Sequence, residues 1–300
     1  MVDPTALARP CSLAALAIVL AGCAAGPARV DTGTPLSAQR IAAIVASPDR
    51  SAADRQNDRR RKPEAMLAFI GLRPGLLALD VSAGGGYTTE LLARGIGPAG
   101  TVYGQSQPRS AARPAAAPVA PEGNSHPDAA RPAASPAAAP ADSARAPRTS
   151  PMALAERSQA LRTAAVPAAT IVAVSRSFDD PVPAELGAAR LDLVTLMFNY
   201  HDLGHMGVDR QRMNRALFDA LKPGGHYVIA DHAGRAGTGI SEAGTLHRVE
   251  EAFLRREIEA AGFRLLAEGH FLRNPADPRD QNTPNPPMPK DEFVLKFVKP

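Results

Sequence analysis

Between residues 76 and 298, short apolar segments alternate with segments of helical pattern, and this alternation constrains the fold more than any other feature of the chain. We expect the strands to be the apolar segments 76–81, 100–103, 170–174, 191–198, 226–230, 263–268 and 293–298. We expect helices over 37–46, 64–70, 87–94 (ended by Gly95), 150–161, 209–221 and 249–261. Strands that alternate with helices form a mostly parallel sheet covered by helices on both faces. The predicted class is therefore α/β.

The alternation is interrupted by residues 107–149, which are mostly Ala, Pro, Ser and Arg. A segment with so little apolar bulk cannot offset the conformational entropy lost when it becomes ordered. A long structureless loop is ordinarily evidence against a single domain, but here the strands and helices resume on its C-terminal side. We therefore predict a disordered insertion within one domain that spans residues 37–300, preceded by a linker at 24–36.

The N-terminus has the features of an export signal. Arg9 precedes the apolar run 12–21, which is about half the length that a membrane-spanning helix needs. The run ends in Leu20-Ala21-Gly22-Cys23, which resembles the lipobox of bacterial lipoproteins. The resemblance implies a signal peptide over 1–23, lipidation of Cys23 and a place in the cell envelope on the periplasmic side. The outer membrane is favoured because Ala24 is not the aspartate that marks inner-membrane retention. The alternatives are an ordinary signal peptide and a start codon assigned upstream of a cytoplasmic enzyme.

The composition excludes two classes of site. The net charge is +4, Lys and Arg are interleaved with Asp and Glu, and only 4% of residues are aromatic. A nucleic-acid-binding surface is therefore not expected. Cys11 and Cys23 are the only cysteines and both precede the domain. The domain consequently has neither a disulfide framework nor a cysteine-based zinc site.

A glycine loop follows the first expected strand, with the sequence Asp80-Val81-Ser82-Ala83-Gly84-Gly85-Gly86. Glycines permit positive φ and let the backbone approach a ligand closely. The next helix offers free N–H groups and the positive end of its dipole to an anion. In a parallel sheet, ligands bind beyond the carboxyl ends of the strands, where this loop is expected. The loop suits a pyrophosphate or a carboxylate, and the alternative is a tight turn without a ligand.

Several segments together resemble class I S-adenosylmethionine-dependent methyltransferases. Residues 79–86 resemble the first motif of that family, 191–194 its fourth strand, and 221–229 its Leu-Lys-Pro-Gly-Gly turn and fifth strand. The resemblance covers about residues 61–300. A subgroup of bacterial methyltransferases without an assigned substrate is similar at Asn199-Tyr200-His201-Asp202, Asp231-His232 and Thr245-Leu246-His247-Arg248. The resemblance implies a Rossmann-like, seven-stranded sheet of order 3-2-1-4-5-7-6 with the last strand antiparallel.

The resemblance also implies S-adenosylmethionine as the cofactor. Its methionine part would bind near Asp80, Ser82, Gly84 and Gly86. Ser82 departs from the family because it replaces the first glycine of the motif. Gln105 is the second departure, because an acidic residue usually holds the ribose hydroxyls at the end of the second strand. Gln105 can still accept one hydrogen bond and donate another, so it stays a candidate ribose ligand.

Methyl transfer requires an oriented acceptor and, where the acceptor is a hydroxyl or an acidic N–H, a base. His201 and His232, at the ends of the fourth and fifth strands, are the candidate bases, and Tyr200 is a candidate to position the acceptor. Asn199 is a candidate contact of the cofactor or acceptor, and Asp179 of the adenine. The alternative for the histidines is a local hydrogen bond at a strand end, and for Asp179 a role in a turn.

Two further patterns carry less weight. The segment His201-Asp202-Leu203-Gly204-His205 approximates H-E-x-x-H, but a zinc site of that type needs both histidines on one helical face. Gly204 and the position after a strand disfavour a helix, so we predict no metal. The run Arg59–Lys62 predicts a solvated helix face, and its alternatives are a lid over the cofactor's carboxylate and a contact with anionic lipid.

The sequence thus predicts S-adenosylmethionine-dependent methyl transfer to a small-molecule acceptor. The alternative, from a different class, is a non-catalytic, membrane-anchored binding protein that retains a degenerate methyltransferase fold. Asp80, Gly84, Gly86 and His201 favour the enzyme. The altered Ser82 and Gln105, the insertion and the lipobox favour the binding protein.

Overall fold

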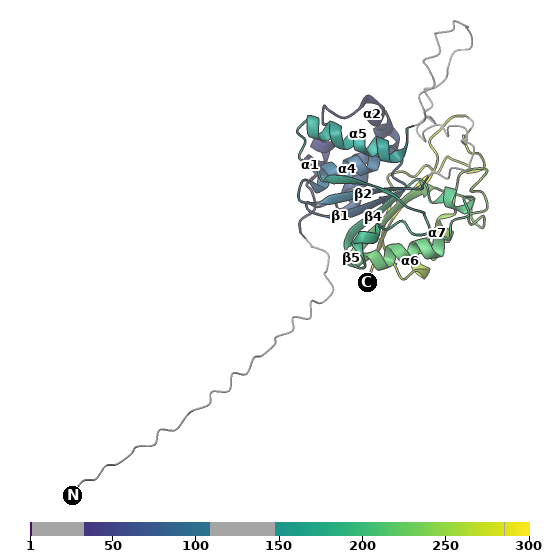
Figure 1. Cartoon of the computed structure of the whole chain (residues 1–300). Coiled ribbons are helices and arrows are strands. Elements are labelled where there is room, and N and C mark those ends of the chain that lie inside the picture. Colours follow the sequence, from purple (N-terminus) through teal and green to yellow (C-terminus); the bar gives the residue numbers. More distant parts are fainter. Residues whose placement is uncertain (2–32, 109–147, 285) are drawn as a thin grey trace.

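The structure is a computed structural model, and it describes residues 1, 33–108, 148–284 and 286–300 (Figure 1). The predicted signal peptide therefore lies, apart from its first residue, outside the described residues. Most of the linker and of the predicted insertion do so as well. Within the described ranges, no helix combines the length and the apolar character that crossing a membrane requires.

The centre of the fold is one seven-stranded sheet of order β3-β2-β1-β4-β5-β7-β6. Its strands are β1 (Leu77–Val81), β2 (Thr101–Ser106), β3 (Thr170–Ser175), β4 (Leu191–Met197), β5 (Leu221–His232), β6 (Arg264–Gly269) and β7 (Glu292–Val298). The pairs among β1 to β5 are parallel, whereas β7 runs antiparallel to both β5 and β6. The predicted strand order and the antiparallel last strand are both confirmed.

Helices cover both faces of the sheet. They are α1 (Ala38–Val45), α2 (Ala52–Arg61), α3 (Pro63–Ile70), α4 (Tyr87–Ile96), α5 (Ser150–Thr163), α6 (Arg210–Ala220) and α7 (Glu251–Ala260), with single 3-10 turns η1 (Ala184–Leu186) and η2 (His201–Gly204). In Figure 1, α1, α2, α4 and α5 lie on one face, and α6 and α7 on the other. The molecule is therefore a three-layer α/β/α sandwich, as the alternating pattern predicts.

The two faces of the sheet carry separate hydrophobic cores. One core joins the sheet to α6 and α7 through side chains such as Met213, Leu217 and Ile258. The other joins it to α1, α3 and α4 through side chains such as Leu67 and Leu92. Successive strand residues point to opposite faces, so the mostly apolar β4 supplies both cores and is buried along its whole length.

Three local expectations were wrong. Helix α4 does not end at Gly95 but continues to Ile96, and Gly97 (φ 70°) follows it. Gly95 is instead a close-packing position, because a Cβ there would come within 2.2 Å of the Leu72 side chain. Leu221 belongs to β5, where it pairs with Leu191, and not to α6. Finally, residues 201–204 form a 3-10 turn where no helical turn was expected.

The fold brings the ends of the central strands to one edge of the sheet. Strands β1, β2, β4 and β5 are parallel neighbours, so their carboxyl ends lie side by side. The glycine loop after β1, the η2 turn after β4 and the end of β5 all lie along that edge. The site is built from these three segments and from the helix α2, which is packed against them.

Candidate functional site

The glycine loop has a preformed left-handed backbone. Ser82, Gly84 and Gly86 have φ angles of 59°, 52° and 79°. A side chain in this region costs of order 1 kcal/mol or more, and two hydrogen bonds hold Ser82 there. Its backbone N–H donates to Gln105 Oε1 (3.0 Å), and its hydroxyl donates to Asn199 Oδ1 (2.7 Å). The turn thus accommodates the Cβ of Ser82, which replaces the first glycine of the motif.

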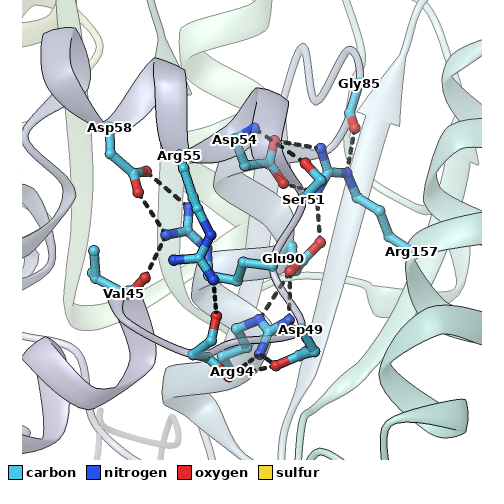
Figure 2. Close-up of polar contacts among 12 residues, drawn as sticks. Val45, Asp49, Ser51, Asp54, Arg55, Asp58, Gly85, Glu90, Arg94 and Arg157 are labelled. Carbon is cyan, nitrogen blue, oxygen red and sulfur yellow. Dashed lines mark hydrogen bonds and ion pairs between the residues drawn. The ribbon is translucent and has the colours of Figure 1, made fainter.

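Arg157 of α5 joins this loop to two helices (Figure 2). Its Nε donates to the Gly85 carbonyl oxygen (2.5 Å), and its two terminal nitrogens donate to both carboxylate oxygens of Asp54 on α2 (2.7 and 2.9 Å). One of them also donates to Glu90 of α4 (2.5 Å). A Cβ at Gly86 would lie 2.8 Å from the Arg157 side chain, so only glycine permits this packing.

Arg94 extends the same network (Figure 2), and Arg50 braces helix α2 beside it. Arg50 forms a bidentate pair with Asp58 of α2 (2.7 and 2.8 Å) and donates to the Val45 carbonyl oxygen. Arg94 of α4 binds Asp49 (2.5 Å) and Glu90 (2.8 Å). Arginine forks of this kind fix carboxylates in a defined orientation. Helix α2 is therefore held against the glycine loop and the start of α4 by charged pairs.

Helix α2 directs Arg61 into a cleft beside the loop. The Arg61 guanidinium carbon lies 4.4 Å from the centre of the Phe198 ring and 5.6 Å from that of Tyr87. These three residues, with Thr88, Met197 and side chains of α3, line a shallow hollow that is partly open to solvent and holds about 20 Å³ of space for water. This is roughly room for one water molecule, so a larger ligand would have to extend out of the hollow or displace its side chains. Of the run predicted to be a solvated helix face, Arg59 is exposed, but Arg61 is half-buried in the cleft.

Asp80 lies beneath the cleft at the end of β1 and is buried. Its two carboxylate oxygens accept hydrogen bonds from the hydroxyls of Thr89 (2.6 Å) and Thr195 (2.7 Å). Burial raises the pKa of Asp80 to about 6, against the opposing effects of these hydroxyls and of Arg61. A carboxyl group with a shifted pKa beside a cleft is a feature of functional sites.

A cluster of histidines and carboxylates follows at the ends of β4 and β5. Asp231 is fully buried and accepts from the His201 backbone N–H (2.8 Å) and from His201 Nδ1 (2.6 Å). With Asp231 as the acceptor, the ring proton of His201 is assigned to Nδ1. Nε2 of His201 then faces Asp202 Oδ1 at 3.3 Å. The second strand-end histidine, His232, is 5.3 Å from His201 between ring centres and contacts Glu292 (3.0 Å).

A hydrogen-bond chain connects the glycine loop to this cluster. Asn199 accepts from the Ser82 hydroxyl and donates through Nδ2 to Asp202 Oδ2 (3.0 Å). The other oxygen of Asp202, Oδ1, lies 2.9 Å from His247 Nδ1. Most of the site residues expected from the sequence thus lie along one edge of the sheet. They are Asp80, Ser82, Gly84, Gly86, Asn199, His201 and His232.

Three predicted site residues have other partners. Gln105 is fully buried: its oxygen accepts from Ser82 N, and its nitrogen donates to the Arg176 carbonyl oxygen (2.6 Å). A ribose contact would require the fully buried side chain to become accessible, because both amide atoms already face protein partners. Asp179 accepts from the Ser177 hydroxyl and from the backbone N–H of Asp209 (2.5 Å), which fits its alternative role in a turn.

Tyr200 points away from the cleft into the core under α6 and α7. It is fully buried, donates to Glu257 (2.8 Å) and accepts from Asn214 (3.1 Å). Burial raises its pKa well above the ordinary value. Its hydroxyl is therefore a structural group on the opposite face of the sheet from Arg61.

The sequence offered Arg61 only within the run Arg59–Lys62, as an alternative to a solvated face, and it did not identify Arg157 or His247 as parts of the site. His247 belongs to a segment without regular structure, and its φ of 51° is set by tertiary contacts. The neighbouring Arg248 is fully buried and binds both oxygens of Asp277 (2.8 and 3.2 Å). The only sequence signal for His247 was the resemblance of segment 245–248 to a methyltransferase subgroup. That resemblance does not indicate that His247 lies beside Asp202.

No protein-family model and no curated protein matches the chain. Solved structures with a similar arrangement include a S-adenosylmethionine-dependent methyltransferase from Aquifex aeolicus (14% identity, TM-score 0.48, 88% of this chain and 100% of that one). A second is an arsenic(III) S-adenosylmethionine methyltransferase from Chlamydomonas reinhardtii (15%, 0.49, 89% and 74%). A third is the fibrillarin of Aeropyrum pernix with natively bound S-adenosylmethionine (14%, 0.40, 76% and 68%). At these identities the function has to be argued from the site.

The buried charge of Asp80 predicts a pH-dependent gain in stability on Asp80→Asn. The folded-state pKa of about 6 lies above the ordinary 3.8, so the carboxyl group stabilises the fold below about pH 4, and this contribution is lost as the pH rises through 6. At pH 7.5 the variant is expected to gain about 1–3 kcal/mol in free energy of unfolding. Urea denaturation at pH 7.5 and pH 4 measures this, and an equal difference at both pH values would contradict the assignment.

The placement of Tyr200 predicts that Tyr200→Phe lowers stability. The substitution removes the hydrogen-bond acceptor of Asn214 Nδ2 and one of the donors to Glu257, which keeps its pair with Arg210. We therefore expect a loss of about 1–3 kcal/mol in urea denaturation. Tyr227→Phe is the matched control, because the described residues offer no hydrogen-bond partner to the buried Tyr227 hydroxyl. The control is expected to be neutral or stabilising, and equal losses in both variants would refute the structural role of Tyr200.

Proposed function

We propose that the chain is a S-adenosylmethionine-dependent methyltransferase that acts on a small-molecule acceptor. The observation that carries the proposal is the preformed glycine loop between β1 and α4, at the edge of a sheet of order 3-2-1-4-5-7-6. Its left-handed backbone leaves room for a ligand close to the main chain. The N-terminus of α4 then offers N–H groups to a carboxylate.

The cleft has groups suited to the two ends of the methionine part. Arg61, held by α2 against Phe198 and Tyr87, supplies a cation for the carboxylate. Asp80 and the Asn199–Asp202 pair supply acceptors for the ammonium group and partial neutralisation for the sulfonium. For the run Arg59–Lys62, the sequence offered a lid over the cofactor's carboxylate as an alternative to a solvated face. The proposal adopts that alternative for Arg61 alone.

The acceptor's place in this proposal is beside His201, beyond Asn199. Since Nδ1 of His201 is committed to Asp231, Nε2 is the atom that would take the acceptor's proton. The acceptor oxygen or nitrogen then attacks the methyl carbon, the carbon–sulfur bond breaks, and the electron pair remains on sulfur. His232, bound to Glu292, is assigned to the wall of the site.

The proposal predicts that Arg61→Ala weakens binding of S-adenosylhomocysteine to the full chain by about 10- to 100-fold, the range of one hydrogen bond to a charged group. The variant is expected to bind 5′-methylthioadenosine, which has no carboxylate, as the unaltered protein does. Calorimetric titration measures both affinities. Arg59→Ala is the matched control, because Arg59 is exposed on the same helix.

The outcomes of that titration separate the alternatives. Equal losses for both ligands in Arg61→Ala would mean that the arginine holds the cleft open and does not contact the carboxylate. No binding of either ligand to folded, unaltered protein would overturn the methyltransferase proposal. That result would leave the alternative of a non-catalytic binding protein, with Ser82 and Gln105 as the first positions to examine.

We further propose that the chain is exported and lipidated at Cys23. The support is the lipobox at residues 20–23, although S-adenosylmethionine is made in the cytoplasm and an exported enzyme would meet little of it. The full chain expressed in a bacterium is expected to start at a lipidated Cys23, as measured by mass spectrometry of its N-terminus. Cys23→Ser is expected to remain unprocessed. An unprocessed, unlipidated wild-type chain would instead indicate a cytoplasmic enzyme.

A further inference from the structure

Three side chains from two separate segments converge at the end of β4. Asp202 Oδ1 lies 3.3 Å from His201 Nε2 and 2.9 Å from His247 Nδ1. All three atoms lie within 4.8 Å of one another. Ligand atoms bound tetrahedrally to one ion at 2.0–2.2 Å are separated by roughly 3.3 Å. Two of the separations are close to this value and the third is at most 4.8 Å, so small side-chain movements would let the three atoms share one ion.

Neighbouring residues orient two of these three side chains. Asp231 accepts from Nδ1 of His201, which turns Nε2 toward Asp202. Asn199 donates to Oδ2 of Asp202, which leaves Oδ1 directed at the histidines. Histidine ligands of metals almost always donate their second ring nitrogen to a carboxylate or carbonyl in this way. The arrangement thus includes the supporting contacts of a metal site as well as its candidate ligands.

The cluster is accessible from one side only. The His201 side chain is fully buried, whereas those of Asp202 and His247 are 20% and 33% exposed. An ion could enter from the exposed side and keep coordination positions free on that side. Three protein ligands with open positions are the pattern of catalytic, not structural, metal sites. His205 is 41% exposed, with Nδ1 3.9 Å from the same Asp202 oxygen, and is close enough to supply a further ligand.

We propose that His201, Asp202 and His247 bind a divalent transition-metal ion of the zinc class. Two imidazoles and one carboxylate favour Zn²⁺, Co²⁺ or Fe²⁺ over Mg²⁺ and Ca²⁺, which prefer oxygen ligands. Sequence analysis tested only the pair His201 and His205 and predicted no metal. The structure assigns His247 as the second imidazole, from a segment that follows β5.

The ion would lie next to the proposed methyl donor. Ser82 of the glycine loop, Asn199 and Asp202 form a continuous hydrogen-bond chain, so the metal ligands are two side chains from the loop. This part of the inference rests on the proposed function: the free positions of the ion bind a hydroxyl or thiol of the acceptor. A metal-bound hydroxyl loses its proton to solvent near neutral pH. The ion then replaces His201 as the group that activates the acceptor, because Nε2 is a ligand.

The test is a titration of the metal-free full chain with Co²⁺, followed by visible absorption. Cys11→Ser and Cys23→Ser form the background, because thiolates would otherwise compete for the ion. One equivalent of Co²⁺ is expected to produce d–d absorption bands of tetrahedral or five-coordinate geometry, and Zn²⁺ is expected to abolish them. Mg²⁺ is expected to leave them unchanged.

Matched variants assign the ligands. His247→Ala and the near-isosteric Asp202→Asn are each expected to weaken Co²⁺ binding by at least about 10-fold. His270→Ala, which removes an exposed histidine far along the chain, is expected to bind as the background does. Circular dichroism confirms that each variant is folded. Absence of the bands in folded protein, or equal affinity in His247→Ala and His270→Ala, would overturn the proposal and reduce the cluster to hydrogen bonds between Asp202 and its histidines.

The same samples are titrated with S-adenosylhomocysteine, so the two proposals fail separately. Nucleoside binding without Co²⁺ binding would refute the metal site and leave the methyltransferase proposal intact. Co²⁺ binding without nucleoside binding would support the metal site and refute the methyl donor. Retained Co²⁺ bands that shift when a catechol or thiol probe is added would support coordination of the acceptor, and bands insensitive to every probe would contradict that role.

Discussion

Three of the central strands carry a buried polar side chain one residue before their carboxyl end, and the site depends on how these side chains are hydrogen-bonded. They are Asp80 in β1, Gln105 in β2 and Asp231 in β5, each 2% exposed or less. A buried polar group without a partner costs about 1–3 kcal/mol, so each must find hydrogen bonds locally. The partners are the hydroxyls of Thr89 and Thr195, the backbone of Ser82 and Arg176, and the backbone and ring of His201. The hydrogen bonds made by these buried side chains therefore fix the loops that form the site.

This dependence explains why Gln105 stands where an acidic residue is usual in the family that the sequence resembles. A carboxylate there could accept from Ser82 N but could not donate to the Arg176 carbonyl oxygen. The amide does both, and it thereby holds the unusual Ser82 in its left-handed conformation. The two departures from the motif are thus in direct contact, and the Arg176 carbonyl oxygen is the group that requires an amide at this position. We infer that any ribose contact in the proposed complex comes from another group.

The sequence predicts those parts of the molecule that local patterns determine. Mostly apolar runs such as 191–197 predict buried strands, and the glycines at 84 and 86 predict a loop with positive φ. Both signals can be read locally because periodicity and backbone freedom are properties of neighbouring residues. The sequence does not predict on which face of the sheet Tyr200 and Arg61 lie, because that depends on the helices packed against each face. Arg61 belongs to a basic run, and α2, which places it in the cleft, is held by ion pairs of Asp54 with Arg157 and of Asp58 with Arg50. His247 depends on the buried pair of Arg248 and Asp277, which no local pattern reports.

The charges of the cleft determine how the proposed methyl donor must lie. Arg61 raises the local positive potential, and its effect reaches Asp80. The donor carries a carboxylate at one end and a sulfonium a few bonds away, so the carboxylate has to face Arg61 and the sulfonium has to lie as far from it as the cleft allows. The direction away from Arg61 that also offers negative charge leads along Asn199 to Asp202. In an orientation chosen by these charges alone, the methyl group points toward His201 and His247. This holds whether the imidazole of His201 or a bound ion activates the acceptor.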